Sequence, residues 1–126
     1  MNHLKVKKIV INIFKNFKLK EAHAEISAEY LIKAELLGAP SHGLSRLKMY
    51  CERLNKKIIN PNPKIKIKKI SQSISHIDAN NSIGFVAANL GIKIAIKNAK
   101  KTGIGLVAIK NSGHYGLSSF YAEQAV

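Results

Sequence analysis

Two short polar clusters interrupt the apolar pattern of this 126-residue chain, and the first is Ser41-His42-Gly43-Leu44-Ser45-Arg46. An imidazole can exchange a proton near neutral pH. A guanidinium can hold a carboxylate with two hydrogen bonds in a fixed orientation, and Ser41 can hold the ring of His42. These residue types predict chemistry on a small hydroxy or keto acid. A capped surface helix with ordinary polar residues is the alternative that fits the same spacing.

The second polar cluster is Asn111-Ser112-Gly113-His114-Tyr115-Gly116. It follows a short apolar run, residues 104–109, that predicts a buried strand. Open α/β sheets bind ligands beyond the carboxyl ends of such strands. The glycines beside His114 let the backbone approach a ligand closely, and a following helix N-terminus favours an anion. The cluster therefore predicts a second part of the site, with an exposed turn histidine as the alternative.

Hydrophobic spacing predicts three helices in the first half of the chain, over residues 5–17 (with a strand as the alternative), 20–37 and 42–54. Ser41 is a good N-cap for the third helix. On that helix His42, Arg46 and Tyr50 would share one face, because side chains four residues apart lie above one another.

The second half of the chain predicts strands at 65–68 and 71–78, a helix at 84–101, a strand at 104–109 and a helix from about 116. Ile65 and Ile67 alternate with lysines, as in a half-buried strand. This order predicts an α/β or α+β fold, in which N-terminal helices precede the beginning of a mixed sheet with covering helices. We expect a helical region over 1–64. We expect the start of an α/β catalytic and cofactor domain over 65–126, incomplete because the pattern stops mid-helix.

The composition predicts a folded core, because 46% of the residues are hydrophobic. Lysines and arginines exceed acidic residues by 14, which is typical of nucleic-acid-binding proteins. However, the lysines are spread along the chain, arginine is scarce and aromatic residues make up 6%. Base readout favours arginine, and stacking platforms need aromatic side chains. We therefore favour solvated lysine-rich faces over a basic nucleic-acid-binding module, which stays as an alternative.

Other signals bear on the compartment and on cofactors. Cys51 is the only cysteine, so no internal disulfide can form, and this suits the reducing cytoplasm. No apolar run approaches the ~18 residues of a membrane span. Residues 103–108 match G-x-G-x-x-A, but the dinucleotide fingerprint follows a strand and opens a helix, and here the order is reversed. His3, His23 and His76 lack metal-ligand spacing, so no metal site is predicted.

Three stretches of the chain match patterns that occur together in one enzyme family. Residues 34–47 are similar to A-D-L-x-G-x-x-S-H-G-x-x-R, residues 59–63 to I-N-P-x-P, and residues 102–116 to G-x-G-L-V-A-V-x-N-S-x-H-F-G. With these three stretches, the chain resembles the malate/L-lactate dehydrogenase family of NAD(P)-dependent 2-hydroxyacid oxidoreductases. The resemblance extends over nearly the whole length of the chain. The resemblance implies a fold other than the Rossmann fold. Sulfolactate, ureidoglycolate and diketogulonate enzymes and a cyclic-imine reductase belong to the same family.

The resemblance also implies roles for the polar residues. Ser41 and His42 would act as a proton-relay pair, and Arg46 would bind the substrate carboxylate. His114 would be an acid/base or substrate-contacting residue. The residues implied to line the substrate are Tyr115, Gly116, Leu117 and Ser118. The cofactor would be NAD or NADP, the substrate a small carboxylate, and the full-length family member a homodimer.

The sequence departs from the family in two respects. Asn80-Asn81-Ser82-Ile83-Gly84 stands where the family has a glycine-richer D-x-x-N-G-x-G stretch, and we expect this change to stiffen a loop without touching a proposed catalytic group. Family members are more than twice as long, and most nucleotide contacts and an Asp of the relay would lie beyond Val126. The leading hypothesis is the N-terminal portion of a 2-hydroxyacid dehydrogenase. An inactive fragment that needs a missing C-terminal half is the alternative.

Overall fold

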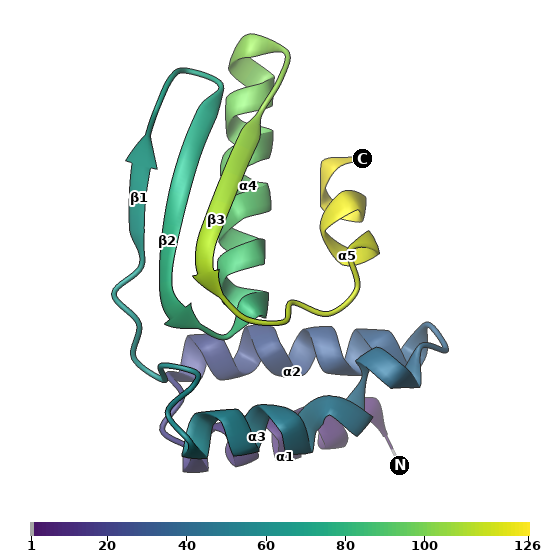
Figure 1. Cartoon of the computed structure of the whole chain (residues 1–126). Helices are drawn as coiled ribbons and strands as arrows, with labels where there is room; N and C mark the ends of the chain where they lie inside the picture. The colour runs from purple at the N-terminus through teal and green to yellow at the C-terminus, as the bar shows by residue number, and fades with distance from the viewer. Residues whose placement is uncertain (1) are drawn as a thin grey trace. The chain divides into compact units, whose positions relative to one another are not determined.

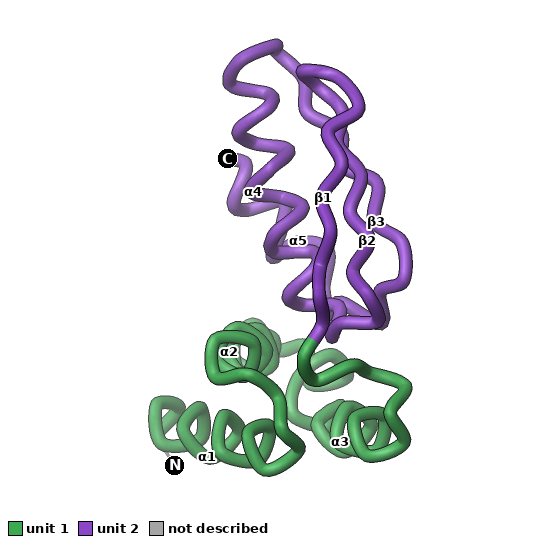
Figure 2. Tube along the Cα trace, turned by 90° about the vertical axis from the view of Figure 1, so that its left-hand side faces the viewer, with its two compact units in different colours: residues 1–62 green, residues 63–126 purple. Residues whose placement is uncertain are grey.

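The computed structural model describes residues 2–126, and the chain divides into two compact units, residues 1–62 and 63–126 (Figure 2). Unit 1 contains helices, and unit 2 contains a sheet with its own helices. The protein therefore has the mixed α/β composition that the sequence predicts. No helix within residues 2–126 is both long and apolar enough to cross a membrane.

Unit 1 is built from the helices α1 (His3–Asn16), α2 (Glu21–Leu36) and α3 (Leu47–Asn55), with the short 3₁₀ turns η1 (Pro40–His42) and η2 (Leu44–Arg46) before α3. The helices expected over 5–17 and 20–37 are confirmed. The Asn2 side chain accepts the backbone N–H of Leu4 at 2.9 Å and so caps α1. Helix α1 packs against α2, and Phe14 of α1 meets Tyr50 of α3 edge to face, with ring centroids 6.5 Å apart.

The continuous helix expected over 42–54 is wrong in its first half. Gly43 has an extended backbone (φ −97°, ψ −138°) that separates η1 from η2. The amides of His42 and Arg46 each bond a carbonyl three residues earlier, at 3.0 Å, as in a 3₁₀ helix. Helix α3 begins only at Leu47, and Ser41 lies inside η1 and caps no helix.

Unit 2 contains the strands β1 (Lys66–Lys69), β2 (Ile74–Ser82) and β3 (Leu106–Ser112) and the helices α4 (Gly84–Thr102), α5 (Ser119–Ala122) and η3 (Glu123–Ala125). The sheet order is β1-β2-β3, with β1 antiparallel and β3 parallel to β2. Helix α4 makes the crossover between the two parallel strands and lies along one face of the sheet (Figure 1). This arrangement confirms the predicted strand–strand–helix–strand order.

The predicted burial of the outer strands is wrong. Every residue of β1 is exposed, Ile67 to 53%, and β3 exposes Leu106 to 52% and Ile109 to 36%. The reason is their place in the sheet, since β1 and β3 are its two edges and β2 lies between them. The buried side chains of the sheet are those of β2, at Ser75, Ile77, Ala79 and Ser82.

The ends of the last elements differ from expectation by a few residues. Helix α4 ends at Thr102, followed by Gly103 in the left-handed region (φ +81°), as the sequence predicts. The G-x-G-x-x-A match thus follows a helix and leads into a strand. Strand β3 runs on through Ser112, so the turn begins at Gly113, and the last helix begins at Ser119 instead of about residue 116.

Candidate active site

The first polar cluster forms a compact loop around Ser41 and His42. The Ser41 hydroxyl Oγ lies 3.1 Å from His42 Nδ1, so the expected contact between these side chains is present. If the hydroxyl donates, the neutral ring carries its proton on Nε2, and if Nδ1–H donates, Nε2 is left as an acceptor. The pair can therefore exchange a proton at Nε2 while Ser41 stays hydrogen-bonded in both states.

Arg46 belongs to the same loop and helps to close it. Its Nε–H donates to the Ser41 carbonyl at 2.7 Å, and the Ser45 hydroxyl donates to the Pro40 carbonyl at 2.5 Å. No carboxylate within residues 2–126 pairs with the Arg46 guanidinium. Because Nε is used for positioning, the two terminal nitrogens remain the donors suited to a ligand carboxylate.

His42, Arg46 and Tyr50 do not share one continuous helix, because the extended backbone at Gly43 separates η1 from η2. Its side chain is 1% exposed and packs on Phe14. Burial raises the pKa of the Tyr50 hydroxyl above its usual range. Tyr50 is therefore a core residue that holds α3.

Glu35 is a residue of this loop that sequence reasoning missed. Its Oε1 accepts the backbone N–H of Leu44 at 2.6 Å. A Cβ at Gly43 would overlap that same carboxylate, so glycine at 43 lets the two approach. The available signal was its place inside the 34–47 stretch, where the family pattern has an acidic residue. The Glu35 carboxylate ties α2 to the segment that carries His42 and Arg46.

Replacing Glu35 by alanine is expected to lower the free energy of unfolding by about 1.5–3 kcal/mol, the range for a hydrogen bond to a charged group. Glu35→Gln keeps an acceptor oxygen and should lose less. Glu25 on the same helix is exposed and gives the matched control Glu25→Ala. Urea unfolding of the variants measures the difference, and equal losses for Glu35→Ala and Glu25→Ala would contradict the role of Glu35.

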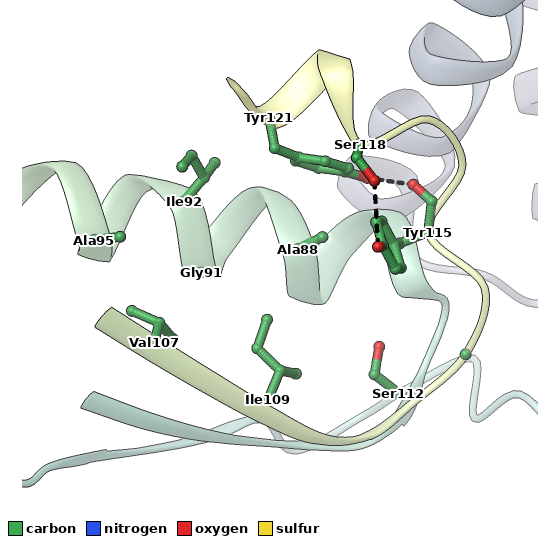
Figure 3. A pocket seen from close by; sticks show the side chains of 11 residues that line it. Ala88, Gly91, Ile92, Ala95, Val107, Ile109, Ser112, Tyr115, Ser118 and Tyr121 are labelled. Carbon is green, nitrogen blue, oxygen red and sulfur yellow. Dashed lines mark hydrogen bonds between the residues drawn. The ribbon is translucent and has the colours of Figure 1, made fainter. Parts of the chain in front are cut away.

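The second polar cluster belongs to unit 2, where it follows β3. The backbone N–H of Gly116 approaches His114 Nδ1 at 3.4 Å. The Tyr121 hydroxyl of α5 donates to the Tyr115 carbonyl at 2.5 Å, and the Tyr115 hydroxyl lies 3.3 Å from Ser118 Oγ. The loop that carries His114 is thus fastened at its far end to α5, as Figure 3 shows.

The start of this loop is held by Asp78 of β2, which sequence reasoning also missed. Its Oδ1 accepts from Asn111 Nδ2 at 2.9 Å and from the backbone N–H of Asn80 at 3.1 Å, and Lys110 Nζ lies 3.7 Å from Oδ2. The hydrogen bonds from Asn111 and Asn80, together with Lys110, hold the pKa of the Asp78 carboxyl below its usual range. The carboxylate therefore fixes the end of β3 just before His114.

A cleft of about 460 Å³ lies between α4, β3 and the segment that leads into α5 (Figure 3). Its walls are mainly apolar, with Ile92, Val107 and Ile109 among them, and the side chains with polar groups are Ser112, Tyr115, Ser118 and Tyr121. Of the residues implied to line the substrate, Tyr115 and Ser118 border this cleft. His114, Gly116 and Leu117 are not among its lining residues.

Cys51 and metal-binding clusters are the remaining candidates for chemistry. Cys51 is half-buried, and burial raises the pKa of its thiol, which makes it a poor nucleophile near neutral pH. No group of three or more His, Cys, Asp or Glu side chains within the described residues could hold a metal ion.

The structure thus brings together Ser41, His42 and Arg46 in unit 1. It brings together His114 and residues 115–118 in unit 2. Each group is held by a carboxylate from a neighbouring element, Glu35 or Asp78.

Comparison with known proteins identifies the scaffold. The chain is 38% identical over 120 residues to L-sulfolactate dehydrogenase of Methanocaldococcus jannaschii, covering 95% of this chain and 35% of that enzyme. It is 40% identical over 116 residues to malate dehydrogenase of Pyrococcus abyssi, covering 92% and 32%. The chain therefore spans about a third of the length of these curated relatives.

Solved structures give the same result. Malate dehydrogenase from Pyrococcus horikoshii superposes with a TM-score of 0.95 at 34% identity, covering 99% of this chain and 36% of that one. Sulfolactate dehydrogenase from Methanocaldococcus jannaschii superposes with a TM-score of 0.94 at 36% identity, covering 98% and 36%. The sequence profile of the malate/L-lactate dehydrogenase family matches residues 1–126. The chain belongs to the malate/L-lactate dehydrogenase family.

Proposed function

We propose that this chain is the N-terminal portion of an NAD(P)-dependent dehydrogenase that interconverts a small 2-hydroxy acid and the corresponding 2-keto acid. The observation that carries the proposal is the loop in which Ser41 holds His42 and Arg46 closes on Ser41. It supplies a proton-exchanging ring and a carboxylate-binding fork within six residues. Membership of a family whose relatives are named malate, sulfolactate and ureidoglycolate dehydrogenases supports the same reaction.

Arg46 has the task of orienting the substrate in this proposal. Its terminal nitrogens bind the carboxylate of the acid in two-point fashion, while Nε stays on the Ser41 carbonyl. That shared hydrogen bond keeps the fork and the Ser41–His42 pair in one rigid loop. A carboxylate bound by the fork is therefore held in a fixed orientation to the pair.

In this proposal, either His114 or the Ser41–His42 pair exchanges the proton of the substrate hydroxyl. When Nδ1 of His114 accepts the Gly116 N–H, the neutral ring carries its proton on Nε2. Nε2–H can then donate to the oxygen of a keto acid as that oxygen gains charge. Tyr115, Gly116, Leu117 and Ser118 line the substrate beside it.

The side chains of this chain fit a nicotinamide-linked reaction, because an imidazole can donate a proton to a keto acid and a guanidinium can bind its carboxylate. When bound, NAD or NADP supplies or removes the hydride at C2 of the acid. The first turn of α4 is not a place for the cofactor's phosphates, since Gly84, Phe85, Val86 and Ala87 are all buried. We therefore expect the nucleotide-binding residues in the remaining two thirds of the family fold, which lie outside the part that this chain matches.

Three further assignments belong to the proposal. The full-length assembly is a homodimer, as the family resemblance implies. The compartment is the cytoplasm, supported by a single half-buried cysteine that forms no internal disulfide. Catalysis needs the remaining two thirds of the family fold, supported by the length of the relatives.

The test is oxidation of NADH and NADPH with a panel of 2-keto acids that includes oxaloacetate, pyruvate and sulfopyruvate. The assay uses the 126-residue chain and a chimera in which this chain replaces the matched third of the Methanocaldococcus jannaschii enzyme. We expect turnover by the chimera with at least one acid and one cofactor. A folded chimera that oxidises neither cofactor with any acid of the panel would contradict the proposed function.

A further inference from the structure

The first residue of α4, Gly84, lies directly against the backbone that carries His114. A Cβ at this buried position would overlap the carbonyl oxygens of Gly113 and His114. Both partners are main-chain atoms, so neither can turn away as a flexible side chain does. The 80–84 stretch, which we expect to touch no proposed catalytic group, thus ends against the main chain of His114 and not against its ring.

The next residue, Phe85, supports the other side of the same loop. Its side chain is fully buried, and a Cβ at Gly116 would lie 2.7 Å from Phe85 Cε1. Gly116 also has φ +79°, a conformation that favours glycine. The Phe85 ring thus contacts the residue whose N–H approaches His114 Nδ1 at 3.4 Å.

We propose that Gly84 and Phe85 are positioning residues for His114. Because Gly84 has no side chain, the Gly113 and His114 carbonyls can pack closely against the start of α4. The Phe85 ring packs against Gly116 and so fixes the position of the Gly116 amide. Together they hold that amide on Nδ1 and so keep the proton of the neutral ring on Nε2. The importance of this tautomer for catalysis rests on the proposed function, whereas the positioning itself rests on the contacts of residues 84, 85 and 113–116.

Gly105, which lies between α4 and β3, offers a matched control in the same unit. A Cβ there would overlap the Ala95 carbonyl oxygen of α4, again a main-chain atom. Gly84→Ala and Gly105→Ala therefore each place a methyl group against a main-chain carbonyl, and only at Gly84 is that carbonyl part of the segment that carries His114. If Gly84 has only a structural role, both variants should lose the same stability, and Gly84→Ala should not selectively change the tautomer ratio of His114.

The experiment is nuclear magnetic resonance of the 126-residue chain with ¹⁵N-labelled histidine, using His114→Gln to assign the His114 ring signals. We expect Gly84→Ala to change the ratio of the two neutral tautomers of His114 by about two- to ten-fold, the effect of losing one hydrogen bond. The pH titration of the His114 ring should shift with it. Gly105→Ala should leave the tautomer ratio and the titration of His114 unchanged.

Phe85→Leu provides a second route to the same answer, because it keeps a buried apolar side chain while removing the ring that contacts Gly116. It should change the His114 tautomer ratio in the same direction as Gly84→Ala. Unchanged His114 signals in folded Gly84→Ala would overturn the proposal, as would an equal change in Gly105→Ala. If Gly84→Ala does not fold, unchanged signals in Phe85→Leu overturn it. Lack of activity in the keto-acid assay would affect only the proposed function.

Discussion

Replacing His114 by alanine in the chimera should reduce turnover by about 10²–10⁴-fold, the contribution typical of a general acid or base. The physical reason is that the keto oxygen would gain charge without a proton donor in place. Turnover of His42→Ala should fall by a factor in the same range if the Ser41–His42 pair, the alternative proton-exchanging group, carries this step. Steady-state oxidation of NADH or NADPH with the preferred acid measures the effect.

The matched control for this prediction is His76→Ala. His76 lies in the same unit, on β2, where it pairs in register with Lys68 and Ala108, and no role in catalysis is proposed for it. Its replacement should change turnover by no more than a few-fold. Near-normal turnover in both His114→Ala and His42→Ala would remove these histidines from the mechanism.

Replacing Arg46 by alanine should raise the KM for the 2-keto acid by about 10–100-fold, because charged hydrogen bonds of ~1.5–3 kcal/mol are lost. The KM of Arg46→Lys should lie between those of Arg46→Ala and the parent protein, because the lysine ammonium is a point charge and lacks the planar two-pronged geometry of a guanidinium. Loss of the Nε–H hydrogen bond to Ser41 also loosens the loop, so turnover should fall in Arg46→Ala as well.

Arg53 is the other arginine of the chain and supplies the control for this prediction. It lies on α3, seven residues further along, and Arg53→Lys should leave the KM within a few-fold of the parent value. Initial-rate measurements over a range of acid concentrations separate KM from turnover. An Arg46→Lys variant with unchanged KM would show that the carboxylate is bound elsewhere.

The sequence predicts best the elements whose signals are local. Helix α4 and its end at Gly103 follow from apolar residues at helical spacing and from one glycine in the left-handed region. The pairing of β1 with β2 follows from alternation and a polar turn. The contact between Ser41 and His42 is also local, because these residues are neighbours in the chain.

Other features could not be predicted because they depend on residues far apart in the sequence. The 3₁₀ turns before α3 are held by the Glu35 carboxylate, which accepts a hydrogen bond from the backbone N–H of Leu44, nine residues further along the chain. The contact of Gly84 with His114 joins residues thirty positions apart. Burial of β1 and β3 was wrongly predicted because an apolar run indicates a strand but not its place at the edge of a sheet.

The proposed function requires that Arg46 and His114 act on one and the same acid. A crystal structure of the chimera with NADH and oxamate, an unreactive analogue of a 2-keto acid, tests this most directly. We predict that Arg46 holds the oxamate carboxylate and that His114 donates to the adjacent carbonyl oxygen, both within about 2.6–3.2 Å. Oxamate bound by other residues, with either side chain out of hydrogen-bonding reach, would contradict the account.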